Sequence, residues 1–554
     1  MLAQVLKNES PFGAGNLTKA VISGSEDFYG ACSLQQFSSA SSLSQTHADA
    51  QGWLDYVTQF RAGNFWFKDA GVKVWEYEET YDNRQDTYGA DAVLAFYHSG
   101  HGNMDSNGVF QAPLGGVWDN RDWAFSNRMA LGNEQVRYLF WSTCFSLRVL
   151  GMHNPIRTWH NSNLGMRMIF GYETTSVDNP NYGKFFWEEW NKSKSFSQAF
   201  LDASWRISSG QAPSVCAMGA NAQEAKDRLY NERIFNWGAV ARNYYEWRWY
   251  YSKSVNSIVK AAEAQVNIPK DPKIAILGTV DAEAAVNRLS AALGYGKKAT
   301  SNVVVDKNGN FYMGNKDMHL FVGKDGRFDA QLAKPNLDNH KQIDSNKAQK
   351  IAENLMSDHD LHQGVKLELD NIRYENGCNG STVGSGKIAD PYITGTTFEF
   401  RQVINGFKTV NADAGVVRVS IDNDGKITHV HNSTREVVDL SNRPKSAPKA
   451  APKSPTDPTS RGVDDASMDI EAAFAHELAR FAHINSNGKG NGNGNGNGGT
   501  RSVDPAPVVA NIKQSDVGYD VSKNYGKLVA RRTYELDMGS DCKKLYKVQV
   551  PIFD

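Results

Sequence analysis

The stretch AVLAFYHSGHG, residues 92–102, decides the fold that we expect for the N-terminal part of this chain. Residues 92–97 carry apolar and aromatic side chains, which is typical of a strand buried on both faces of a parallel sheet. The run ends abruptly at two histidines, His98 and His101, interleaved with small residues. In open α/β sheets, ligands bind at the carboxyl ends of such strands. The sequence therefore predicts functional residues in this loop.

Two further apolar runs predict neighbouring strands. Residues 136–141 are followed by the sequence STC, which ends at Cys144, and residues 166–170 are followed by GYETTSVDNP. Apolar residues then recur at helical spacing after Ser195, which we expect to cap a helix. Strands alternating with helices predict a doubly wound α/β sheet. The aromatic run YYEWRWYYSK, residues 244–253, favours a last helix that packs on this sheet.

Composition excludes several classes of protein. A chain of 554 residues with 60 basic and 61 acidic side chains has no excess of positive charge, so neither nucleic acid nor an anionic membrane surface is an expected partner. No apolar run approaches the roughly 20 residues that span a bilayer. The N-terminus lacks the pattern of a secretory leader, which indicates a cytoplasmic protein or a sequence recorded without its leader. Five scattered cysteines predict neither a disulfide framework nor a zinc ribbon.

A chain of this length is expected to form several domains, separated by segments of biased composition. Asn-Gly and Asp-Gly pairs between alternating apolar residues predict β-hairpins after the α/β domain. Pro/Lys-rich and Gly/Asn-rich sequences predict linkers. The expected segments are an α/β domain over 1–262, an α+β domain over 263–442, a linker over 443–461, a helical segment over 462–486, a flexible tether over 487–500 and a small β-rich module over 501–554.

His101 and Cys144 are expected to meet, because each follows a strand of the same parallel sheet and the interval between them leaves room for one right-handed crossover. A thiol needs a nearby base to become a useful nucleophile, and histidine supplies one. Gly102 allows close approach of a substrate backbone. Its N–H, with that of Cys144, is suited to form an oxyanion hole.

The blocks AVLAFYHSGHG and VRYLFWSTC resemble the two-block signature of the caspase-like (clan CD) cysteine peptidases. The similarity is closest to CHAT- and gingipain-type domains and to an uncharacterised bacterial group of them. It covers about residues 20–250 and continues in Asp178, in a Gly-x-Phe helix at 183–190 and in the segment 195–204. It implies a three-layer α/β/α domain with a mostly parallel sheet.

The resemblance also implies a mechanism. Cys144 would be the nucleophile and His101 the general acid/base of a dyad that hydrolyses peptide bonds without a metal or cofactor. The backbone of Gly102 and Cys144 would polarise the scissile carbonyl of a protein or peptide substrate. His98, Glu173 and Asp178 are candidate substrate-binding residues, the two acids because they suit a basic side chain before the cut.

Two residues depart from the family pattern. Trp141 is bulky in a block where small residues are usual, and His98 is a histidine without a family role.

The second domain carries a resemblance of its own. Residues 396–433, TTFEFRQVINGFKTVNADAGVVRVSIDNDGKITHVHNS, look like PepSY and thermolysin-propeptide modules, which occur beside exported peptidases and act as inhibitors or folding aids. This similarity implies that residues 263–442 hold the enzyme inactive until self-processing in the exposed linkers at 443–460 and 487–499. It favours a secreted or surface-exposed bacterial protein over a cytoplasmic one.

Two alternatives stay open at this point. One is a non-catalytic binding scaffold that keeps the caspase-like core. The other is a metal-dependent hydrolase that uses His98 and His101, since histidines, Cys144 and also His153 or His160 offer zinc-type ligands.

Overall fold

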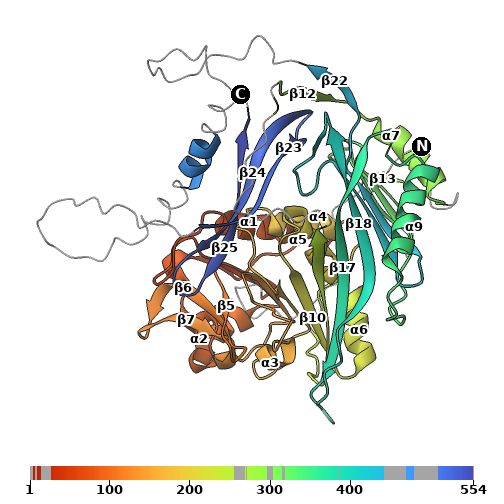
Figure 1. Cartoon of the computed structure of the whole chain (residues 1–554). Coiled ribbons are helices and arrows are strands. Elements are labelled where there is room, and N and C mark those ends of the chain that lie inside the picture. The colour runs from red at the N-terminus through yellow and green to blue at the C-terminus, as the bar shows by residue number, and fades with distance from the viewer. Residues whose placement is uncertain are drawn as a thin grey trace, which may run out of the picture.

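The computed structural model describes residues 4–5, 9–13, 27–254, 269, 271–295, 303–314, 318–362, 364–384, 386–441, 470–478 and 510–552. Across these residues the protein is a mixed α/β structure built on one large sheet, with smaller antiparallel sheets beside it (Figure 1). Successive pairings along the large sheet give the order β3-β2-β4-β8-β9-β10-β11-β17-β18-β20-β21-β16-β15-β14-β13-β1.

The N-terminal part of the sheet is parallel where the sequence predicts parallel strands. Strands β3, β2, β4, β8 and β9 all run in the same direction, and β10 and β11 then continue antiparallel. The three predicted apolar strands are therefore confirmed. The bounds are β2 (Tyr29–Ser33), β3 (Phe65–Lys68), β4 (Ala95–Ser99), β8 (Tyr138–Ser142), β9 (Met168–Tyr172), β10 (Pro213–Gly219) and β11 (Tyr244–Ser254).

The aromatic run at the end of this part is a strand, so the expectation of a helix there is wrong. In β11, Tyr245, Trp247 and Trp249 alternate onto one face and are buried. This period of two suits a strand that has partners on both edges. Strand β11 pairs with β10 on one edge and with β17 (Leu367–Ser381) on the other, from Tyr244 to Ser254. The sheet thus continues from the α/β part into the α+β part.

The α+β part extends the sheet with antiparallel strands. The three predicted Asn-Gly and Asp-Gly hairpins are confirmed, and each turn places its glycine at positive φ: Gly309 at 82°, Gly326 at 82° and Gly425 at 84°. The strands are β18 (Tyr392–Ile404), β20 (Val416–Asp422), β21 (Ile427–Asn432), β16 (Phe328–Gln331), β15 (His319–Val322), β14 (Phe311–Gly314), β13 (Val304–Val305) and β1 (Gln4–Val5), with the short β19 (Phe407–Lys408) paired to β18. The helices of this part are α7 (Ala282–Ala292) and α9 (Ser345–Asp358).

One face of the parallel part is covered by three helices, α1 (Thr46–Val57), α4 (Tyr182–Trp190) and α5 (Phe196–Ile207), whose buried residues form one cluster with the sheet. Ser195 caps α5, as predicted, by accepting a hydrogen bond from the Gln198 amide at 3.3 Å. Helices α1 and α4 touch at Gly183, where an added Cβ would lie 2.5 Å from the backbone of α1. A further helix, α6 (Ala222–Asn231), packs beside β10 and β11.

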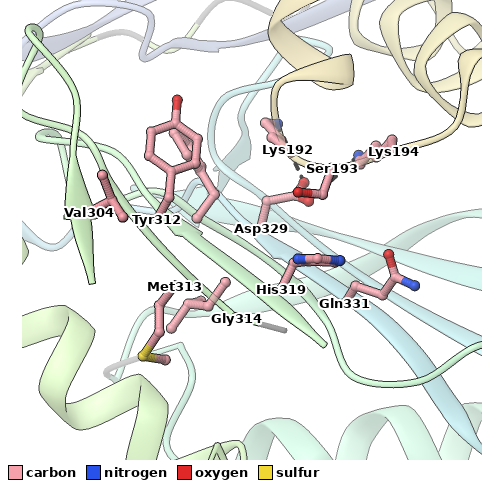
Figure 2. A pocket seen from close by; sticks show the side chains of 12 residues that line it. Lys192, Ser193, Lys194, Val304, Tyr312, Met313, Gly314, His319, Asp329 and Gln331 are labelled. Atoms are coloured by element: carbon pink, nitrogen blue, oxygen red, sulfur yellow. Dashed lines mark hydrogen bonds and ion pairs between the residues drawn. The ribbon is translucent and has the colours of Figure 1, made fainter. Parts of the chain in front are cut away.

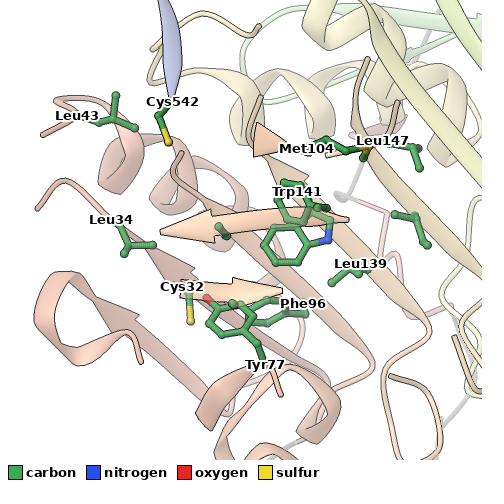
Figure 3. Packing of buried hydrophobic residues seen from close by; sticks show 14 of the residues in the cluster. Cys32, Leu34, Leu43, Tyr77, Phe96, Met104, Leu139, Trp141, Leu147 and Cys542 are labelled. Atoms are coloured by element: carbon green, nitrogen blue, oxygen red, sulfur yellow. The ribbon is translucent and has the colours of Figure 1, made fainter. Parts of the chain in front are cut away.

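The other face is covered partly by the C-terminal end of the chain. Strands β24 and β25 reach down against the N-terminal part (Figure 1), and residues of both strands share one buried cluster with Trp141 and Cys32. Figure 3 shows part of this cluster, with Cys542 from the turn between the two strands. Near this face lie β5 (Asn103–Met104), β6 (Phe110–Trp118), β7 (Arg121–Phe125), α2 (Asp82–Tyr88) and α3 (Pro155–Trp159). Strands β24 (Tyr525–Asp537) and β25 (Lys543–Pro551) belong to a five-stranded sheet that also contains β12 (Ile274–Leu277), β22 (Val437–Ser441) and β23 (Ala510–Asp520).

Several predicted segments lie outside the described residues. The linker over 443–461 and the tether over 487–500 are outside them entirely. Of the predicted helical segment over 462–486, residues 470–478 are described and are helical. The C-terminal module predicted to be β-rich is a β-sheet over the described residues 510–552. In the part of the chain that the structure describes, no helix combines the length and the apolarity needed to cross a membrane.

Candidate active site

His101 and Cys144 follow adjacent strands at the carboxyl edge of the parallel sheet. Strands β4 and β8 pair in register, Ser99 opposite Ser142. The Gly100 amide extends this pairing by donating to the Ser142 carbonyl at 3.4 Å. The loops that carry the histidine and the cysteine therefore leave the sheet side by side.

The two loops touch at Gly102. A Cβ added to this glycine would lie 2.6 Å from the Cys144 carbonyl oxygen and 2.9 Å from Cβ of Thr143. A side chain of any size would push the loops apart, because one of these neighbours is backbone and cannot swing away. Glycine at this position lets the histidine loop and the cysteine loop pack directly against each other.

The His101 ring is buried and held in one orientation. Its Nε2 lies 2.9 Å from the Ser41 carbonyl oxygen, which can only accept, so Nε2 carries the proton in the neutral ring. Its Nδ1 is buried and has no hydrogen-bond partner among the described residues. Burial and the Lys544 ammonium lower the pKa of His101 to about 3. The ring is therefore neutral at physiological pH, with the lone pair on Nδ1.

His98 points into the core rather than toward a substrate. Its Nδ1 lies 2.8 Å from the Tyr77 hydroxyl, and its ring packs 4.7 Å from the Trp141 ring. Burial, assisted by Lys544, lowers the pKa of His98 to about 3. This residue anchors the end of β4 to the core.

The low pKa of His98 gives a pH-dependent contribution to stability. His98 is neutral in the fold but binds a proton below about pH 6.5 when unfolded, so its contribution is complete above that pH and is lost as the pH falls toward about 3. We expect wild-type protein to lose about 1.4 kcal/mol more per pH unit than His98→Gln between about pH 6 and pH 4. Urea unfolding followed by Trp fluorescence at stepped pH measures the difference. The exposed residue His359 supplies the control variant His359→Gln, which should keep the wild-type slope. Equal slopes for His98→Gln and wild type would contradict the assignment.

Cys144 is fully buried, and its thiol lies among backbone and hydroxyl groups. The Ser176 amide donates to Sγ at 3.2 Å, and the Ser176 hydroxyl lies 3.4 Å away. The S–H group donates to the Lys543 carbonyl oxygen at 3.1 Å. Cys542 lies beside it, and burial together with the Cys144 thiol raises the pKa of Cys542 to about 12. All five cysteines of the chain are buried and unbridged.

The loop after β9 carries both acidic candidates, Glu173 and Asp178, and the two carboxylates have different hydrogen-bond partners. Glu173 accepts from the amides of Val149 and Leu150, so it holds the loop that follows Cys144. Asp178 accepts from the Ser44 amide and hydroxyl, both at 3.0 Å. Burial raises the pKa of Asp178, and the Lys544 ammonium acts in the opposite direction. Glu173 also forms an ion pair with Arg148 at 3.5 Å, whereas the nearby cation that acts on Asp178 is Lys544.

Asp49, which the sequence analysis did not single out, stabilises the end of β4 next to the candidate site. Asp49 of α1 is buried and accepts from the Tyr97 hydroxyl and the Ser99 hydroxyl, each at 2.7 Å, and from the Gly183 amide at 2.9 Å. It ties the end of β4 to α4. The signal in the sequence is a carboxylate on the same helical face as Ala50 and Trp53, where an apolar residue is expected.

The structure gives the metal alternative no ligand set in the described residues. No group of three or more His, Cys, Asp and Glu side chains lies close enough to hold an ion in the part of the chain that the structure describes. His98 and His101 have the separate partners described above. His160 contacts the Tyr245 hydroxyl at 3.1 Å.

A pocket of about 340 Å³ lies elsewhere, between the α4–α5 connection and strands β14 to β16 (Figure 2). It is lined by Lys192 and Lys194, whose ammonium groups each lie 3.5 Å from Asp329, together with Tyr312 and His319. The charged groups that line the pocket pair with one another and with Glu189, so these side chains form a buried ion-pair network.

Comparison with known proteins leaves the function open. Residues 30–253 match a family described as a domain of unknown function, DUF6345. The match runs from β2 into β11 and includes both candidate site loops. No curated protein and no solved structure matches the chain.

Proposed function

We propose that the protein is a cysteine endopeptidase of the caspase-like type, in which Cys144 and His101 form the catalytic dyad. The observation that carries the proposal is the contact of Gly102 with the Cys144 backbone at the carboxyl edge of five parallel strands. It joins the histidine loop to the cysteine loop as the clan CD resemblance requires. Five parallel strands with helices α1, α4 and α5 on one face also support the proposal, while strands β24 and β25 cover part of the other face, where the three-layer architecture would have helices.

The tautomer of His101 suits a general base. Its Nδ1 lone pair would take the thiol proton, and the Cys144 sulfur would attack the carbonyl carbon of a peptide bond. The backbone amides of Gly102 and Cys144 would stabilise the oxyanion. Collapse of the tetrahedral intermediate expels the amine, which takes the proton from His101, and water then hydrolyses the thioester. No cofactor is needed for this sequence of steps.

One observation favours the second candidate, a non-catalytic scaffold of the same fold. Cys144 and His101 are each 0% exposed, and the thiol donates to a carbonyl group of the same chain. If Cys144 and His101 never become accessible to a peptide, the protein would have the fold of a peptidase without peptidase activity.

Hydrolysis by matched variants separates the two candidates. The substrate is a mixture of unstructured peptides, and cleavage is followed by mass spectrometry, together with the intact mass of the protein itself. We expect Cys144→Ala to abolish cleavage and His101→Ala to lower the rate by roughly 10²–10⁴-fold, the usual contribution of a general acid/base. Cys216→Ala, which removes a buried thiol of β10, is the control and should keep the wild-type rate. Cleavage of the peptides at the same measurable rate by wild type and Cys144→Ala would reject Cys144 as the nucleophile.

A further inference from the structure

The C-terminal strand runs across the candidate active site as a bound peptide would. The Leu545 amide donates to the Ser176 carbonyl at 3.1 Å, and the Leu545 carbonyl accepts from the Asp178 amide at 3.0 Å. Leu545 forms a parallel bridge with Val177. Such backbone pairing is how an extended peptide adds to a sheet edge or loop, where it gains affinity independent of its side chains.

A lysine side chain of this strand enters the site. Lys544 is 3% exposed, and its ammonium donates to the Ser176 hydroxyl at 3.0 Å. It lies near Asp178, His98 and His101, since it influences the pKa of each of them. A buried ammonium needs such an acidic and polar setting.

The Cys144 thiol meets this strand in an orientation that does not lead to attack. A peptide held for cleavage presents its carbonyl carbon to the sulfur and its oxygen to backbone N–H donors. Here the Lys543 oxygen accepts from the thiol at 3.1 Å, so the oxygen faces the sulfur. The strand therefore fills the site while its own peptide bond stays intact.

The strand is anchored by the turn that precedes it. The Ser41 amide donates to the Met538 carbonyl at 2.9 Å, and the Ser540 hydroxyl donates to the Ser39 carbonyl. Ser41 is also the residue whose carbonyl orients His101. The turn between β24 and β25 thus contacts the loop around Ser41, whose carbonyl group is hydrogen-bonded to the His101 ring.

We propose that residues 542–546, named here the resident strand, occupy the peptide-binding groove of the Cys144 site and block its thiol. The groove takes an extended peptide that runs parallel to residues 176–178 and places a lysine side chain against the Ser176 hydroxyl. A substrate of this class must displace the resident strand to reach the thiol. The substrate part of this inference rests on the proposed peptidase function, whereas the blocking of the thiol does not. Within residues 263–442, the strands from β17 to β21 extend the large sheet in the described part, and the inhibition expected of this region stays a prediction.

Alkylation of the full-length chain tests the blocking directly. Lys544→Glu places a carboxylate beside Asp178 and should expel the strand. Lys543→Glu makes the same charge change one residue earlier, where the side chain is exposed. Brief treatment with iodoacetamide, followed by peptide mapping, gives the labelling rate of each cysteine. We expect Cys144 to label at least tenfold faster in Lys544→Glu than in wild type and within twofold of wild type in Lys543→Glu, while Cys32 and Cys216 stay unlabelled. Rapid labelling of Cys144 in the wild type would overturn the inference.

Hydrogen exchange of the wild type keeps the test independent of how the variants fold. A displaceable strand predicts that the amides of Leu545 and Asp178 exchange together, through a local opening, faster than the amides of β4 and β8. If these two amides exchanged as slowly as the amides of β8, the resident strand would be a permanent part of the core, and the inference would be overturned. Fast labelling of Cys144 in Lys544→Glu without cleavage of lysine-containing peptides would reject the proposed function and leave the blocking in place.

Discussion

Glu189→Gln is expected to lower the free energy of unfolding by about 3–5 kcal/mol, the usual cost of removing one partner from a buried ion pair. The Glu189 side chain is 2% exposed and accepts from Lys192 at 2.7 Å, Lys194 at 2.6 Å and Arg206 at 3.0 Å. Glutamine keeps the size of the side chain but leaves three cations short of a negative charge. The loss should appear as a lower urea midpoint and a lower melting temperature in Trp fluorescence.

The neighbouring residue provides a matched control. Glu188 is 41% exposed and pairs with Arg206 at 2.8 Å, so Glu188→Gln should cost no more than about 1 kcal/mol. The attraction of the three cations lowers the pKa of Glu189 to about 2 despite its burial. Its contribution is therefore complete above about pH 4.5 and is lost as the pH falls toward about 2. A Glu189→Gln variant as stable as Glu188→Gln at pH 7 would show that the network relaxes around the missing charge.

Trp141→Ala is expected to destabilise the protein by about 3–5 kcal/mol, the range for truncating a buried aromatic residue. The side chain lies on β8, three residues before Cys144, and is 0% exposed. It packs at 4.7 Å from the His98 ring, 4.9 Å from the Phe110 ring and 6.0 Å from the Trp159 ring. Figure 3 shows Trp141 within the hydrophobic cluster on this face of the sheet, together with Leu139, Tyr77 and Phe96.

This packing explains why a bulky residue occurs in the cysteine block. Trp141 fills the space between β8 and the layer that contains β6 and α3, so the block carries an aromatic residue where the family signature has small ones. Trp66→Ala on the edge strand β3 removes a half-buried tryptophan and should cost clearly less. Equal destabilisation by the two variants in urea unfolding would contradict a central role for Trp141.

Local patterns predicted the elements whose neighbours are close in sequence. The apolar runs before His98 and Cys144 gave β4 and β8, and Asn-Gly and Asp-Gly pairs gave the three hairpins. The cap at Ser195 also follows from sequence alone, because it needs only the amide three residues later. Such features depend on backbone preferences and on period, both of which are written in short windows.

Where partners are distant in sequence, local patterns were insufficient. The spacing of residues 244–253 suits a helix. The segment is nevertheless a strand, because it lies between the edges of β10 and β17 and pairs with both. Tertiary pairing overrides propensity in such a segment. The role of Asp49 was missed for the same reason, since its partners Tyr97 and Gly183 lie far along the chain.

The sequence by itself determined the parallel strands and the positions of His101, Gly102 and Cys144 at their ends, because strand period and the direction of parallel strands fix both. Only the tertiary structure decided what fills the site. The contact between Cys144 and Lys543 joins residues almost 400 positions apart, and no local pattern encodes which distant strand will meet a groove. That choice depends on the shape and charge of the assembled surface, where the Ser176 hydroxyl accepts a hydrogen bond from Lys544.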